Sequence, residues 1–280
     1  MKTLYCHSGI GDILMLKMVC TTLKITPEII IFPKLLMKEY SLNYENRVLF
    51  VTFFINLIFD DCKIIFSEDP IFFSPINYFT KFMNNNFRKI NKYYMCENII
   101  DKIIKKGKKN VLFSEYVVIH MKIRMDYGYE KFKTNAYEQI LSFLNSKIVG
   151  KNIVLLGEKT ITLNLESKIH KFVSLYHDLV SCKSNNNVTD LTTDTINDHI
   201  NLNFDNFIDD INIIHNAKLN IIIGIGGPLT ISAAFSNNFI SYVEKDTLDA
   251  YPAIFPIMEQ KTKMYHEVNN FIAECNTLIN

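Results

Sequence analysis

Two short glycine-containing segments are the residues best suited to chemistry in this chain of 280 residues, which has only 9 glycines. The first is Ser8-Gly9-Ile10-Gly11-Asp12, between a strand-like stretch and a run with helical spacing. Glycines at such a turn let the backbone approach a ligand closely, and the free N–H groups of a helix start favour an anion. Gly11 is therefore a candidate binding residue. Asp12 is either a helix cap or a general base.

The second segment, IGIGGPLT at residues 223–230, again joins a strand-like run to a helix start, and it contains three of the nine glycines. Pro228 suits a first helical turn, and Thr230 offers a hydroxyl near unpaired N–H groups. We expect Gly226, Gly227, Pro228 and Thr230 to cradle a diphosphate. The alternative is an ordinary tight turn.

Neither segment matches a standard nucleotide motif. The third glycine of a GxGxxG pattern falls on Leu14, and no Gly-Lys-Ser/Thr follows either loop. A dinucleotide cofactor site of the usual kind is disfavoured.

A third group of polar residues ends the strand-like run at 116–121. Lys122 and Arg124 follow His120 there, and positive charge at a strand end can stabilise a departing diphosphate. The alternatives are a solvated turn for the two cations and a packed strand-end residue for His120. Glu158 follows a later strand, NIVLLG, at an equivalent position.

The elements that must position these residues alternate between strands and helices. In the first half we expect strands at 2–7, 28–32 and 63–67, and helices at 12–24, 44–58 and 96–106. In the second half we expect strands at 116–121, 152–157, 171–176, 219–224 and 239–243. Helices are expected there at 135–147, after Thr160, at 204–217, at 228–235 and near 264–278, with a polar loop at 183–200.

This alternation, with Ile- and Val-rich strands, predicts a doubly wound α/β fold with parallel sheets. We expect two Rossmann-like domains facing a cleft: residues 1–108 on the acceptor side and 109–263 binding a nucleotide sugar. A helix in 264–280 closes the chain. Ligands in such folds bind outside the carboxyl ends of the strands.

Three segments together resemble a known family: Gly9-Ile10-Gly11-Asp12, NIVLLGEK, and AKLNIIIGIGGPLTISAAFSNNFISYV. They are similar to the bacterial lipopolysaccharide heptosyltransferases, which are glycosyltransferases of the GT-B fold. In that family a later loop touches the donor nucleotide sugar, and Gly227, Pro228, Ala233 and Ala234 match it here. Its Asp, Thr and His fall on Ile225, Gly226 and Thr230, so the polar donor contacts differ. The cations after His120 are also similar to the His-x-Arg loops of fucosyltransferases.

The resemblance implies an inverting glycosyltransferase that acts in glycan biosynthesis. Asp12 would deprotonate a saccharide acceptor. Gly11, Lys122, Arg124, Glu158 and the 226–230 turn would bind a nucleotide-diphosphate sugar, which is the donor substrate rather than a cofactor. Rival readings are a nucleotide-sugar epimerase of the same architecture and a noncatalytic glycan- or nucleotide-binding module.

Charge and composition limit the partners. Thirty Lys and Arg balance 29 Asp and Glu, which argues against a protein that grips nucleic acid phosphates. The chain has no Asp-x-Asp, no HExxH and no CxxC among its 6 cysteines, so we expect no metal. No signal-peptide pattern or stretch of about 20 apolar residues is found, which predicts a cytoplasmic protein with no transmembrane segment. The lysines at 102–109 leave peripheral membrane contact open.

Overall fold

The computed structural model describes residues 2–39, 43–68, 82, 97–104, 114–122, 135–147, 150–157, 160–165, 168–174, 187–191, 204–224, 227–243 and 263–279. The chain forms two compact units. The first comprises Met1–Gly107, Asp198–Asp209 and Pro252–Lys261, and the second comprises Lys108–Asn197, Asp210–Tyr251 and Thr262–Asn280. The long helix starting at Phe204, which the sequence assigns to the second domain, thus divides between the two units.

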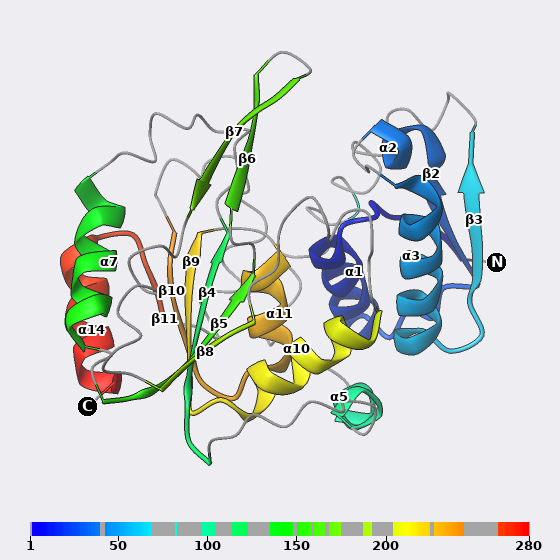
Figure 1. Cartoon of the computed structure of the whole chain (residues 1–280). Helices are drawn as coiled ribbons and strands as arrows, with labels where there is room; N and C mark the ends of the chain where they lie inside the picture. The colour runs from blue at the N-terminus through cyan, green and yellow to red at the C-terminus, as the bar shows by residue number, and fades with distance from the viewer. Residues whose placement is uncertain are drawn as a thin grey trace. The chain divides into compact units, whose positions relative to one another are not determined.

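The first unit is built on a parallel three-stranded sheet of order β1-β2-β3 (Figure 1). Its elements are β1 (Thr3–Tyr5), α1 (Ile10–Thr22), β2 (Ile29–Pro33), α2 (Lys34–Glu39), α3 (Tyr44–Ile58), β3 (Lys63–Ser67) and α5 (Glu97–Ile104). Successive right-handed crossovers in one direction place their helices on one face of a sheet, and α1 and α3 do pack together. The turn between β1 and α1 therefore lies at the carboxyl edge of this sheet.

The second unit is built on a parallel six-stranded sheet of order β11-β10-β9-β4-β5-β8. Its strands are β4 (Val117–Lys122), β5 (Asn152–Gly157), β8 (Asn187–Asp190), β9 (Leu219–Gly224), β10 (Phe239–Tyr242) and β11 (Lys263–Tyr265). From the centre of the sheet, β4, β5 and β8 follow one another toward one edge, and β9, β10 and β11 follow one another toward the opposite edge. The order reverses between β4 and β9, which is the topological switch point of a doubly wound sheet.

Helices cover both faces of this sheet, as Figure 1 shows. They are α7 (Asn135–Lys147), α10 (Phe204–Asn216), α11 (Gly227–Phe235) and α14 (Val268–Ile279). On the face of α7 and α14, Ile119, Leu155 and Ile221 pack against Ile140 and Phe271. α11 packs against β4, β9 and β10. Burial on both faces explains why the strands read as continuous apolar runs rather than alternating ones.

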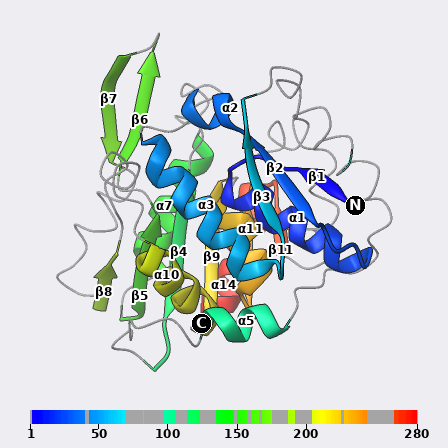
Figure 2. The ribbon, with the colours of Figure 1, turned by 90° about the vertical axis from the view of Figure 1, so that its right-hand side faces the viewer.

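The structure corrects several sequence expectations. The helix expected after Thr160 is instead strand β6 (Thr160–Leu165), which forms a β-hairpin with β7 (Lys168–Ser174). β7 overlaps the strand expected at 171–176, and both views show the hairpin apart from the six-stranded sheet (Figures 1 and 2). The sequence of β6, TITLNL, alternates polar residues with Ile and Leu, a period-two pattern that favours a strand. The expected polar loop at 183–200 contains β8, while α2 and β11 were not anticipated.

Helix α3 is apolar on nearly all sides. Phe50 and Phe54 are buried in the first unit, where the ring of Phe207 lies 5.2 and 5.3 Å from their ring centroids. Leu49 and Phe53 of the same helix are exposed. None of the helices in the described part of the chain combines the length and the apolar character needed to cross a bilayer.

Candidate functional site

The turn between β1 and α1 brings the Asp12 carboxylate back over the backbone. Gly9 is the N-cap residue of α1, and Asp12 is the third residue of the helix. A Cβ atom on Gly9 would lie 2.5 Å from Oδ2 of Asp12 and 3.5 Å from its Cγ. The φ of Gly9 is −68°, which any residue adopts, so what glycine contributes here is the room that it leaves for the present position of the Asp12 side chain. A carboxylate at this position also interacts favourably with the helix dipole.

Arg47 of α3 reaches the same turn from 39 residues away along the chain. Its Nη2 donates a hydrogen bond of 2.5 Å to the carbonyl oxygen of Ser8, and its Nε is buried with no hydrogen-bond partner among the described residues. The guanidinium carbon lies 5.9 Å from the ring centroid of Phe50. Burial lowers the pKa of Arg47, and the charge of Asp12 acts in the opposite direction. Asp12 and Arg47 therefore interact as opposite charges.

The N-terminal cap of α3 determines the position of Arg47. Asn43 is the N-cap residue, and its side-chain oxygen accepts a hydrogen bond of 3.1 Å from the Asn46 backbone N–H. Arg47 follows in the next position, and its N–H donates to the Asn43 carbonyl oxygen over 3.1 Å. The cap thus sets the register that directs Arg47 toward the β1–α1 turn.

Cys6 lies on the β1 side of this turn and is fully buried. Burial raises the pKa of its thiol well above the ordinary value, and the Asp12 charge and Cys20 raise it further. The thiol therefore stays protonated at neutral pH and is a poor nucleophile. Asp12 therefore interacts electrostatically with two side chains, a neutral thiol at Cys6 and a charged guanidinium at Arg47.

In the second unit, the carboxyl ends of β4 and β9 meet at the switch point. Lys122, the last residue of β4, is the register partner of Gly224, the last residue of β9. Gly224 has a φ of 103°, and Gly157, which ends β5 on the other side of β4, has a φ of 97°. These positive values lie in the left-handed region of backbone conformation, which favours glycine.

Helix α11 begins three residues after β9, at Gly227. No described heavy atom lies within 4 Å of a Cβ placed on Gly227, so the helix starts beside open space. Pro228 is the second residue of the helix, as its missing N–H allows. Pro228 and Thr230 are both buried, with Thr230 4% exposed. This edge therefore offers a helix N-terminus and backbone rather than a free Thr230 side chain.

The expected site residues divide between the units. Gly11 and Asp12 belong to the first unit, and Lys122, Gly227, Pro228 and Thr230 to the second. Arg124, Glu158 and Gly226 lie outside the described residues. His120 is 9% exposed and packs within the sheet layer of the second unit, as expected for a strand-end histidine. Within the described residues, no three His, Cys, Asp or Glu side chains group closely enough to hold a metal ion.

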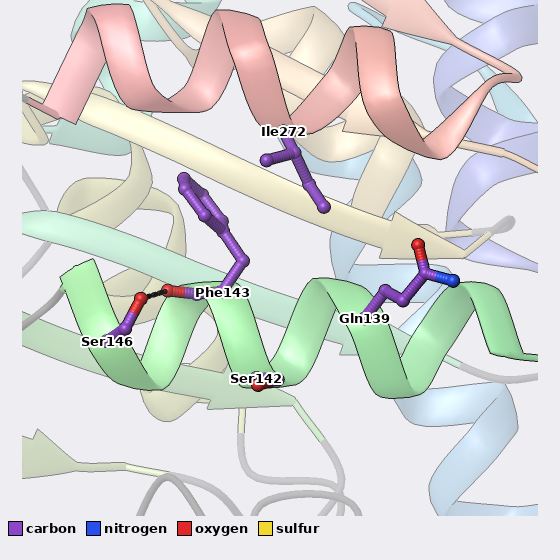
Figure 3. Close-up of a pocket in the computed structure, with 5 residues that line it drawn as sticks. All are labelled: Gln139, Ser142, Phe143, Ser146 and Ile272. Carbon is purple, nitrogen blue, oxygen red and sulfur yellow. Dashed lines mark hydrogen bonds between the residues drawn. The ribbon is translucent and has the colours of Figure 1, made fainter.

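A shallow pocket of about 500 Å³ lies elsewhere on the second unit, between α7 and α14. Figure 3 shows Phe143 and Ile272 turned toward the space between the two helices. Gln139, Ser142 and Ser146 complete its lining, and the Ser146 hydroxyl donates a hydrogen bond of 2.7 Å to the Phe143 carbonyl oxygen. This lining has no ionisable side chain, so it offers neither an acid nor a base.

Sequence reasoning missed Arg47. It follows Glu45 and Asn46 in the first turn of a mostly apolar helix, and no motif or spacing connects it with residues 8–12. The one available signal was that Arg47 directly precedes the long apolar run of this helix, where a cation needs a partner once the helix is buried. A comparison of the chain with protein-family models, with curated proteins and with solved structures finds no match.

Proposed function

We propose that this protein is a metal-independent glycosyltransferase of the GT-B type that transfers a sugar from a nucleotide-diphosphate donor to a saccharide acceptor. The second unit would bind the donor, and the first would supply Asp12 as the base. The resemblance of the glycine turns to the heptosyltransferases suggests this reaction class. The sugar, the nucleotide and the acceptor are open in this proposal.

The observation that carries the proposal is the switch point between β4 and β9. Open α/β sheets bind ligands outside the carboxyl ends of the strands at such a point. Here the glycine-ended β9 leads to the N-terminus of α11, which attracts a phosphate, and Lys122 ends the neighbouring strand. A nucleoside diphosphate fits this combination of backbone N–H groups, open space and one cation.

In the proposed reaction, the Asp12 carboxylate takes the proton of an acceptor hydroxyl. The acceptor oxygen forms a bond to the anomeric carbon of the donor, and the bond from that carbon to the diphosphate oxygen breaks. Its electron pair leaves with the nucleoside diphosphate, whose charge Lys122, Arg124 and the 226–230 turn stabilise. Attack opposite the leaving group inverts the anomeric configuration.

A thermal-shift panel of UDP, GDP, ADP, CMP and TDP sugars tests the donor site. One nucleotide class should raise the melting temperature, because a ligand that binds only the folded state stabilises it. Gly227→Val should weaken that binding at least about tenfold, or ~1.4 kcal/mol, since a branched side chain would occupy the phosphate position. Ser142→Val on the exposed face of α7 is the matched control and should bind like the parent.

Product analysis separates the alternatives. Transfer to an acceptor with release of a nucleoside diphosphate supports the proposal. Conversion of the donor alone into another nucleotide sugar would identify an epimerase instead. Binding of a nucleotide sugar without any turnover would identify a noncatalytic module, and unchanged binding by Gly227→Val would place the diphosphate elsewhere.

A further inference from the structure

We propose that Arg47 is a positioning residue that holds the Asp12 carboxylate in place, and in its ionised form, over the β1–α1 turn. The inference rests on the proposed function in that Asp12 is taken as the base. Arg47 itself would touch no reacting atom. It would act through Asp12, so that an available base faces the acceptor hydroxyl at neutral pH.

The geometry of the turn supports this role. The Arg47 guanidinium is attached to the Ser8 carbonyl oxygen, and the Asp12 carboxylate lies against Gly9, the next residue. The cation and the anion therefore lie beside two consecutive backbone positions. Both groups are anchored to rigid elements, because Asp12 is in α1 and Arg47 is in the capped first turns of α3. Helices α1 and α3 pack directly on each other.

The charges around Asp12 make Arg47 the important neighbour. Asp12 is half-buried, and burial disfavours the charged form of a carboxylate. The Cys6 thiol, on the β1 side, remains neutral because burial raises its pKa. His7, in the turn itself, is the other titratable side chain of this segment, and Glu45 on α3 is exposed. A guanidinium can offset the burial and keep Asp12 ionised, since an opposite charge nearby lowers the pKa of a carboxyl group.

The test measures the pKa of Asp12 by carboxyl-carbon NMR in the full-length protein. Arg47→Gln should raise the Asp12 pKa by about one unit or more, a tenfold change in its proton affinity. Arg47→Lys, which keeps the charge but not the planar donor group, should give a value between those of the parent and Arg47→Gln. Lys63→Gln is the matched control, because it removes one exposed cation from the opposite end of the same sheet.

An Asp12 pKa in Arg47→Gln equal to that in Lys63→Gln would overturn the inference. Should Arg47→Gln fail to fold, Asp12→Asn provides the reciprocal measurement, and the Arg47 guanidinium protons should then exchange with solvent at least about tenfold faster. Unchanged exchange would also overturn the inference.

The activity readout keeps this inference distinct from the proposed function. With a donor identified, Arg47→Gln should lower kcat and shift the rising limb of the pH profile upward, while the donor KM stays unchanged. A raised Asp12 pKa in a protein without any transferase activity would refute the proposed function and leave the role of Arg47 toward Asp12 standing.

Discussion

At the residue scale, substitution of Asp12 would show whether the protein is the proposed catalyst or a binding protein. Its position at the third residue of α1 suits a helix-stabilising carboxylate, and the same carboxylate interacts electrostatically with the Arg47 guanidinium. These two roles predict different consequences of removing the charge while keeping the shape of the side chain.

Asp12→Asn should reduce stability by about 1–3 kcal/mol, because it removes a favourable charge–dipole interaction at the helix N-terminus and leaves the partly buried Arg47 guanidinium without its opposite charge. Transfer should fall on the order of 10² to 10⁴-fold, the usual contribution of a positioned general base. Donor affinity should be almost unchanged. Chemical denaturation, steady-state kinetics and donor titration measure the three quantities, and full transferase activity in the variant would make Asp12 a purely structural residue.

Gly9→Ala perturbs the same carboxylate without altering any charge. The new methyl group would lie 2.5 Å from Asp12 Oδ2, so the flexible end of that side chain must turn away. The backbone at Gly9 already suits alanine, and we expect a stability change within about 1 kcal/mol. Activity should fall at least about tenfold. A crystal structure of the variant with Asp12 in its original position, together with full activity, would show that Asp12 does not depend on the absence of a side chain at Gly9.

At the element scale, the β9–α11 connection contains two glycines whose substitutions test different properties: backbone strain at Gly224 and ligand binding at Gly227. Gly224 has a φ of 103°, whereas Gly227, at the start of the helix, has open space and no such backbone requirement.

Gly224→Ala should destabilise the protein by about 1–3 kcal/mol, because a side chain at positive φ is strained. Gly227→Ala is the matched control and should change stability by less than about 1 kcal/mol, since alanine favours the helix. Urea unfolding of both variants measures the difference. Equal stabilities would mean that the connection relaxes to a conformation that accepts a side chain at 224.

Tyr116 attaches α10 to the start of β4 within the second unit. Its hydroxyl donates a 2.9 Å hydrogen bond to the Ile213 carbonyl oxygen, and burial raises its pKa to about 12. Tyr116→Phe should destabilise the protein by about 0.5–1.5 kcal/mol at pH 7, the usual net value of such a bond.

The pH dependence of that effect has a definite sign. The neutral phenol is favoured in the folded state, so its contribution is full below the ordinary pKa of about 10 and declines as the pH rises toward about 12. The stability difference between the parent and Tyr116→Phe should therefore shrink above pH 10. A difference that grows with pH would contradict the buried hydrogen bond.

At the scale of the whole molecule, charge and metal requirements are the testable properties. With 30 basic and 29 acidic side chains, the chain has a formal net charge of +1. Under the proposed function, and because the sequence contains no Asp-x-Asp pair, we expect protein groups to neutralise the donor diphosphate. EDTA should leave the transferase rate within about a factor of two. Loss of turnover in EDTA with rescue by manganese or magnesium would contradict this.

The sequence by itself determined the parallel α/β character of the protein. Buried strands and their crossover helices have distinct local periods, so α3, α7, β3, β5 and β9 begin and end where the pattern predicts. The position of Asp12 in the first turn of a helix was predictable for the same reason, because a strand followed by a glycine turn and a helix is a local pattern. The helix predicted after Thr160 was wrong, because strand β6 lies at 160–165, whereas the strand predicted at 171–176 overlaps β7.

Only the tertiary structure decided the strand order, the switch point between β4 and β9, and the contact of Arg47 with the first glycine turn. Strand order depends on which non-adjacent strands pair, and no local period encodes that choice. Arg47 reaches Ser8 across 39 residues because α1 and α3 pack on one face of a sheet. Such a contact depends on three-dimensional packing, which the spacing of residues along one chain does not reveal.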